Sequence, residues 1–182
     1  YHVPLLLKEQ KIMKFLSQKL RLDTIKLSAE SLQKGEHLLT RWKTLTANYD
    51  RTFETVTIAL VGKYTHLKDS YLSVIKSLEH SSMKCNRKLK IEWVESSDLE
   101  EETKTSDLLK YHKAWHHVCQ AEGILVPGGF GSRGIEGMVA AAKYARESNL
   151  PYLGVCLGLQ IAVIEFVRNV IGITDSTSME FD

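Results

Sequence analysis

A cysteine framed by two glycines is the pattern with the clearest chemical meaning in this sequence. Residues 154–158 read Gly-Val-Cys-Leu-Gly and lie where an apolar run turns into a segment with helical spacing. This arrangement is typical of a nucleophile elbow, with Cys156 in place of serine. The tight turn presents the sulfur, and the start of the next helix favours a thiolate and offers N–H groups to an oxyanion. The alternative is a small apolar cysteine packed at a strand end.

A glycine-rich segment follows an earlier apolar run. Residues 126–134 read Val-Pro-Gly-Gly-Phe-Gly-Ser-Arg-Gly. The Gly128-Gly129 pair can adopt backbone angles closed to other residues, so its N–H groups can converge on an anion, as an oxyanion hole requires. A plain tight loop is the main alternative. A phosphate loop would need Gly-Lys-Ser/Thr, and a dinucleotide loop would need an acidic residue at the end of a following strand, so both are weaker.

A third glycine-marked run ends at residues 61–64, Val-Gly-Lys-Tyr. Lys63 could bind an anionic ligand there, or it could be a solvated lysine at a strand end.

Three histidines cluster in a helix predicted over residues 107–121, together with Trp115. His112 and His116 are four residues apart and can face the same way, but no acidic third ligand has suitable spacing. We therefore predict no metal site, and a polar helix surface that could contact a partner.

The positioning elements alternate between strand and helix. We predict four buried strands, at residues 57–62, 89–94, 123–127 and 151–156. Helices are predicted at residues 69–84, 107–121, 135–148 and 158–171. Such alternation produces right-handed crossovers and an open, mostly parallel three-layer α/β sheet, whose chemistry lies at the carboxyl ends of the strands. The acidic run at residues 98–102 is interpreted as a solvated loop.

The first part of the chain has another character. Residues 5–22 and 30–49 each carry apolar side chains at helical intervals, with a polar stretch between them. We predict two amphipathic helices in a helical extension or linker. The predicted division is 1–54 and 55–182.

Composition limits the function classes. At 182 residues and 20.7 kDa, the chain can hold one domain with an appendage, and its start at Tyr1 suggests part of a longer protein. Its net charge of +2 comes from dispersed residues, which disfavours a nucleic-acid partner, and no apolar run could span a membrane. Three cysteines match neither a zinc pattern nor a secreted framework, which favours a cytoplasmic location. Cys85 and Cys119 lack glycine framing and are predicted to be structural thiols.

Taken together, the motifs resemble those of the triad-type (class I) glutamine amidotransferases, and in detail the CTP synthase family of the eukaryotic cytosolic type. The motifs that carry the resemblance are residues 154–160 (Gly-Val-Cys-Leu-Gly-Leu-Gln), 127–137, 59–64, 69–71 and 176–181. Residues 1–5 resemble the last part of that family's synthetase domain, so the resemblance covers nearly the whole chain.

The resemblance implies a flavodoxin-like sheet and glutamine hydrolysis. Cys156 would attack the glutamine side-chain amide and form a thioester, while the N–H groups of Gly129 and Leu157 hold the oxyanion. The implied glutamine-binding residues are Gly129, Phe130, Leu157, Gln160 and Glu180.

It also implies that ammonia passes to a synthetase domain of the same enzyme, where ATP with Mg²⁺ drives the amination of UTP to CTP. No cofactor is expected in this segment. GTP would activate the full enzyme, and the candidates for that response are Lys63, Tyr64, Arg133 and Glu136. Homotetramers and filaments are implied as well, with His112 and Trp115 on the filament contact.

One departure from the family pattern limits these expectations. The family's general base is a histidine followed two positions later by a glutamate, both downstream of the nucleophile, yet no histidine follows His117 here. We therefore expect this chain alone to be inactive. The alternatives are a cysteine hydrolase or peptidase of related fold, and a non-catalytic assembly module.

Overall fold

The computed structural model describes residues 1–181, apart from the side chains of Asp23 and Lys68, so Asp182 at the end of the second predicted domain lies outside the described residues. The chain divides into two compact units. One comprises Tyr1–Glu54 with Cys85–Arg87, and the other comprises Thr55–Lys84 with the chain from Lys88 onward.

The first unit is helical. It contains α1 (Val3–Glu9), α2 (Ile12–Lys19), the 3₁₀ turn η1 (Leu22–Thr24) and α3 (Ala29–Arg51). The Ser28 hydroxyl caps α3 by accepting the Ser31 N–H at 3.1 Å. The predicted helix over residues 30–49 is confirmed, but the single helix over 5–22 is wrong. Lys11, at φ 56°, is in the left-handed region and separates α1 from α2.

The second unit is built on a four-stranded sheet. Its strands are β1 (Thr55–Gly62), β2 (Lys88–Glu95), β3 (Gly123–Val126) and β4 (Tyr152–Gly154). All pairings are parallel, and the strand order is β2-β1-β3-β4. This is the order of a doubly wound, flavodoxin-like sheet, so the predicted fold class is confirmed.

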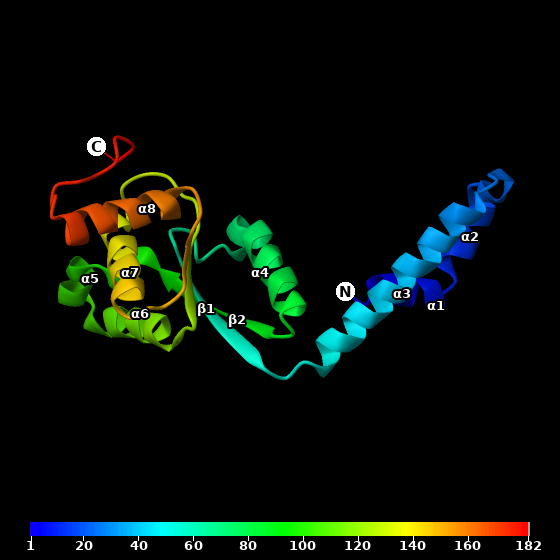
Figure 1. Cartoon of the computed structure of the whole chain (residues 1–182), viewed down its shortest axis with the longest axis horizontal. Helices are drawn as coiled ribbons and strands as arrows, with labels where there is room; N and C mark the ends of the chain where they lie inside the picture. The colour runs from blue at the N-terminus through cyan, green and yellow to red at the C-terminus, as the bar shows by residue number, and fades with distance from the viewer. Residues whose placement is uncertain (182) are drawn as a thin grey trace. The chain divides into compact units, whose positions relative to one another are not determined.

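Helices cover both faces of this sheet. They are α4 (Leu72–Lys84), which follows the turn η2 (Lys68–Tyr71), α5 (Glu101–Ser106), α6 (Leu108–Gln120), α7 (Ile135–Glu147) and α8 (Leu157–Phe166), which continues into the π turn η4 (Val167–Ile171). Val61 and Val126 pack on the face with α6, α7 and α8, whereas Leu60 and Leu125 pack on the opposite face with α4. Adjacent strand residues point to opposite faces, and Figure 1 shows the resulting three layers.

The acidic run at residues 98–102 is not a solvated loop. It forms the end of the turn η3 (Ser96–Leu99) and the start of α5. Leu99 is only 2% exposed and belongs to the core, which anchors the segment. Glu101 and Glu102 occupy the first turn of α5, where carboxylates are favoured by the helix dipole.

Helices long and apolar enough to cross a bilayer are absent from the described part of the chain.

Candidate active site

The residues with predicted chemical roles follow the carboxyl ends of the strands. Lys63 follows β1, the glycine-rich loop follows β3, and Cys156 follows β4 by two residues. Because the strands are parallel, these ends share one edge of the sheet.

Cys156 lies immediately before α8 in a strained backbone conformation. Its φ of 54° and ψ of −107° lie outside the regions favoured by residues with a side chain. The thiol is exposed. Within residues 1–181 it makes no side-chain hydrogen bond, so the backbone presents the sulfur without another side chain covering it.

Steric constraints explain why glycines stand two residues before and two residues after Cys156. A Cβ on Gly154 would lie 2.2 Å from the carbonyl oxygen of Gly158, and a Cβ on Gly158 would lie 2.1 Å from the carbonyl oxygen of Val126. Both distances are far below any normal contact. The turn can therefore close on β3 only when both positions are glycine.

The glycine-rich loop lies against the cysteine. A Cβ on Gly128 would lie 3.5 Å from Cys156 Cβ and 3.8 Å from its Sγ, and a Cβ on Gly129 would lie 3.4 Å from Leu157 Cδ2. Within the described chain, neither the Gly129 N–H nor the Leu157 N–H donates to a protein acceptor. Two N–H donors without protein acceptors near a presented thiol suit the binding of an oxyanion.

The remaining glycines of this loop serve packing and turning. Gly131 and Gly134 have φ of 78° and 74°, and a Cβ on Gly134 would lie 2.0 Å from Ser96 Oγ. A Cβ on Gly137 would lie 1.8 Å from the Ser96 carbonyl oxygen. The start of α7 thus packs closely on the start of η3, which explains this spacing without a dinucleotide.

Gln160 and Glu180 lie together, although 20 residues separate them in sequence. Gln160 Nε2 donates to Glu180 Oε2 at 3.1 Å. Gln160 Oε1 is buried and has no partner in the described chain, which leaves an acceptor for a ligand donor. Phe130, another predicted glutamine-binding residue, is 77% exposed.

Lys63 is buried, so of the two alternatives left open by the sequence, the solvated strand-end lysine is excluded. It is 3% exposed. Its Nζ donates to the carbonyl oxygens of Phe130, at 3.1 Å, and of Gly131. Burial, together with the nearby Arg133 guanidinium, lowers the pKa of Lys63. Tyr64 beside it is 41% exposed.

Two polar residues that the sequence did not single out, Glu95 and Thr65, join Lys63 and Arg133 in this cluster. Arg133 donates to the carboxylate of Glu95 and to the carbonyl oxygen of Lys63. Glu95 also accepts the Thr65 hydroxyl at 2.6 Å. The only sequence signal for Glu95 was its position at the end of a predicted strand. Lys63, Tyr64 and Arg133 therefore gather, whereas Glu136 does not hydrogen-bond to them.

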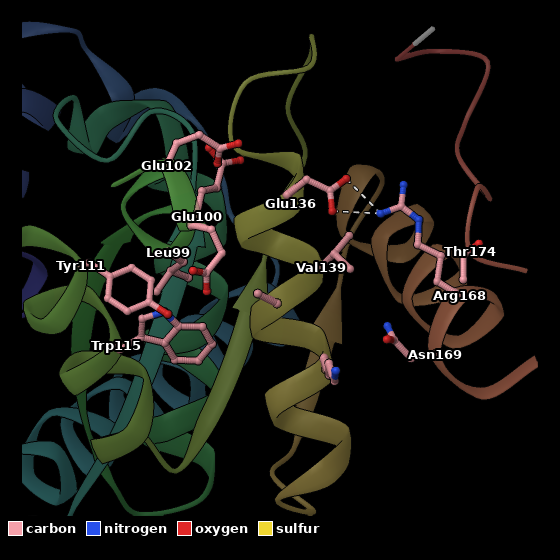
Figure 2. A pocket seen from close by; sticks show the side chains of 13 residues that line it. Leu99, Glu100, Glu102, Tyr111, Trp115, Glu136, Val139, Arg168, Asn169 and Thr174 are labelled. Atoms are coloured by element: carbon pink, nitrogen blue, oxygen red, sulfur yellow. Dashed lines mark hydrogen bonds and ion pairs between the residues drawn. The ribbon is translucent and has the colours of Figure 1, made fainter. Parts of the chain in front are cut away.

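Glu136 instead faces a separate cavity. Arg168 Nη1 donates to both of its carboxylate oxygens at 2.9 Å, as Figure 2 shows. The cavity has a volume of about 500 Å³ and is lined by residues of η3, α5, α6, α7 and η4. Neither Cys156 nor Gln160 lines it.

The two residues predicted for an assembly contact differ in exposure. His112 is exposed on α6. Trp115 is half-buried beside the cavity, with its ring centroid 5.9 Å from that of Tyr144, and its buried Nε1 has no partner in the described chain. The side chain of Trp115 is therefore partly used for packing.

Neither the remaining histidine of the cluster with an acidic neighbour, His117, nor the other two cysteines indicate a metal site. His117 Nδ1 lies 2.7 Å from Glu92 Oε2. Among the described residues no group of His, Cys, Asp or Glu is arranged to hold a metal ion. Cys85 and Cys119 are both exposed, so their prediction as structural thiols is wrong with respect to burial.

Several known proteins are similar to this chain in sequence. Residues 66–181 match the family described as Glutamine amidotransferase class-I. The chain is 64% identical over 181 residues to CTP synthase of Candida glabrata and 63% identical over 181 residues to CTP synthase 1 of Saccharomyces cerevisiae. All of this chain is covered, but it spans only 31% of the length of each of these curated relatives.

A solved structure supports the same assignment. The glutaminase domain of Trypanosoma brucei CTPS with bound acivicin is similar at a TM-score of 0.61 and 44% identity, covering 70% of this chain and 46% of that one. A family match over more than half of the chain and a shared fold thus accompany the cysteine elbow. The chain belongs to the class I glutamine amidotransferase family.

Proposed function

We propose that this chain is the glutamine-hydrolysing part of a CTP synthase. The observation that carries the proposal is the strained, exposed Cys156 beside the N–H groups of Gly129 and Leu157. Family membership and the 63–64% identity to fungal CTP synthases support it. Glutamine is the proposed substrate, and the Gln160–Glu180 pair is the proposed binding group for its polar ends.

The proposed chemistry proceeds in two steps. The Cys156 thiolate attacks the side-chain amide carbon of glutamine, and the Gly129 and Leu157 N–H groups stabilise the resulting oxyanion. Collapse of this intermediate breaks the C–N bond, and ammonia leaves as it gains a proton. Water then attacks the thioester and releases glutamate and the thiol.

Proton transfer needs a base next to the thiol. None of the histidines in residues 1–181 hydrogen-bonds to Cys156. General acid–base catalysis typically contributes about 10²–10⁴-fold, so we expect residues 1–182 alone to hydrolyse glutamine slower by about that factor than a complete triad does.

In the full protein, the ammonia would aminate UTP to CTP in a synthetase domain that uses ATP with Mg²⁺. We further propose a cytoplasmic location and activation by GTP. Lys63, Tyr64 and Arg133 are the better-supported candidates for the GTP response because they cluster, whereas Glu136 pairs with Arg168.

Selective modification of the thiol tests the proposal. Acivicin has an amino-acid head and a ring chlorine that a thiolate can displace, so it should modify Cys156 at least tenfold faster than Cys85 or Cys119, and glutamine should protect. Iodoacetamide needs only an accessible thiol, and all three cysteines are exposed, so Cys85 and Cys119 serve as internal controls. The measurement is peptide mass spectrometry over time. Equal acivicin modification of all three thiols would favour a general cysteine hydrolase or a non-catalytic module.

Assembly into tetramers and filaments is proposed for the same protein, with the exposed His112 on the contact. His112→Ala should reduce particle size in light scattering without changing thermal stability. Trp115→Ala is a poorer test because Trp115 also packs in the core. Unchanged particle size in His112→Ala would remove this contact.

A further inference from the structure

Lys63 is a buried cation whose hydrogen-bond acceptors are backbone carbonyls. It is 3% exposed, and its Nζ donates to the carbonyl oxygens of Phe130 and Gly131. Within the described residues it forms no ion pair with a carboxylate. The Glu180 and Glu100 carboxylates favour the Lys63 charge only from beyond ion-pair distance, and burying an ammonium without a paired carboxylate is costly.

The backbone of Lys63 is held by hydrogen bonds at both its N–H and its carbonyl oxygen. Its N–H donates to the Tyr71 hydroxyl at 3.1 Å, and its carbonyl oxygen accepts the Arg133 guanidinium. Arg133 is in turn held by the buried Glu95. The amine therefore projects from a rigid strand end.

The side chain reaches the loop that carries one of the oxyanion donors. A Cβ on Gly129 would lie 3.3 Å from Lys63 Cδ and 3.4 Å from Leu157 Cδ2. The aliphatic stem of Lys63 thus lies against Gly129. Because each peptide unit is planar, hydrogen bonds to two successive carbonyls fix the two peptide planes that follow Phe130 and Gly131.

We propose that Lys63 is a positioning residue for the oxyanion-binding loop. Its ammonium group fixes the peptides after Phe130 and Gly131, its stem supports Gly129, and together they hold the Gly129 N–H toward the oxyanion that forms at Cys156. The proposal rests on the proposed glutaminase function. Lys63 acts through the loop and does not touch the reacting atoms.

The test separates oxyanion binding from thiol access. The chloromethyl ketone analogue of glutamine is attacked by the thiolate at the ketone, which creates an oxyanion before the S–C bond to the methylene carbon forms and chloride leaves. Iodoacetamide alkylates the thiolate by direct displacement of iodide, without an oxyanion. Both rates are measured at Cys156 in the full-length protein for wild type, Lys63→Met, Lys63→Gln and Lys63→Arg. Lys84→Met, at an exposed lysine that ends α4, is the matched control.

We expect Lys63→Met to slow the ketone reaction about 100-fold, the lower end of the loss that follows removal of one oxyanion donor, while iodoacetamide reacts at the wild-type rate. Glutaminase kcat should fall in parallel, with KM within about threefold. Lys63→Gln, whose amide ends short of the ammonium position, should show the same split if Lys63→Met does not fold. Lys63→Arg should recover much of the loss because it keeps donors to carbonyls.

Two outcomes would overturn the proposal. One is a ketone rate in Lys63→Met and Lys63→Gln equal to wild type. The other is an equal loss with both reagents together with a lowered melting temperature, which indicates a general structural role. Failure of the proposed function would look different, because wild type itself would then show no preference for the glutamine-shaped ketone at Cys156 over Cys85 and Cys119.

Discussion

Gly158→Ala should disrupt both halves of the active site with one methyl group. The new Cβ would lie 2.1 Å from the carbonyl oxygen of Val126, which accepts the Val155 N–H at 3.0 Å. That hydrogen bond joins the cysteine turn to the end of β3, directly before the glycine-rich loop. Relieving the overlap requires a backbone shift of about 1 Å, and a misplacement of that size typically costs about 100-fold in rate.

Two contributions determine how much stability the Gly158→Ala variant should lose. Overpacking costs about 1–3 kcal/mol, and a weakened backbone hydrogen bond adds about 1 kcal/mol, so the free energy of unfolding should fall by about 2–4 kcal/mol. For a chain of this size, that lowers the melting temperature by at least about 4 °C. Acivicin modification of Cys156 should slow about 10–100-fold.

The assay combines thermal unfolding with mass spectrometry of the modified cysteine. Gly35→Ala is the matched control, because nothing lies within 4 Å of its Cβ position and it is in the interior of α3. That control should stabilise its helix by about 0.5–1 kcal/mol. A Gly158→Ala variant with the melting temperature and modification rate of wild type would refute the steric explanation of the glycine spacing.

Two further predictions concern the stability lost through backbone strain at Cys156 and through burial of the Glu100 carboxylate. Cys156→Gly should raise the free energy of unfolding by about 1 kcal/mol relative to Cys156→Ala, because glycine tolerates φ of 54°, and equal urea stabilities of the two variants would contradict backbone strain. Burial raises the pKa of Glu100 above its ordinary 4.5, so its ionisation opposes folding as pH rises from 4.5 through the raised value. Glu100→Gln should therefore stabilise the protein more at pH 7 than at pH 4 in urea unfolding, and a gain of the same size at both pH values would count against this origin.

The sequence was most informative where a structural feature is determined by residues that are close together in the chain. Alternation of short apolar runs with helical segments predicted the four strands and the parallel sheet, since each feature depends on residues close in sequence. The glycine spacing around Cys156 predicted the tight turn because the clash it avoids lies within four residues and at the neighbouring strand.

The missed features depend on distant pairs. Lys63 and Gly131 are 68 residues apart, and Arg133 and Glu95 are 38 apart, so no local pattern indicates that they meet. The burial of Lys63 and of Leu99 within residues 98–102 escaped the sequence for the same reason, although Glu101 and Glu102 are exposed as expected. A charged residue alone predicts solvent, whereas burial is decided by what the rest of the fold places over it.

Three departures from ordinary fold rules lie near the carboxyl edge of the sheet, although others, such as the Nε1 of Trp115 that has no partner within residues 1–181, lie elsewhere. Cys156 has an unfavourable φ, Lys63 is a cation buried without a carboxylate partner, and Gln160 Oε1 is a buried acceptor without a donor. Each destabilises the protein unless a ligand or reacting group uses it. These three residues come from different segments, yet all contact or lie within the turns after β1, β3 and β4. Such costs are expected where the backbone is arranged for chemistry, and their position near Cys156 supports the proposed active site on grounds separate from the family match.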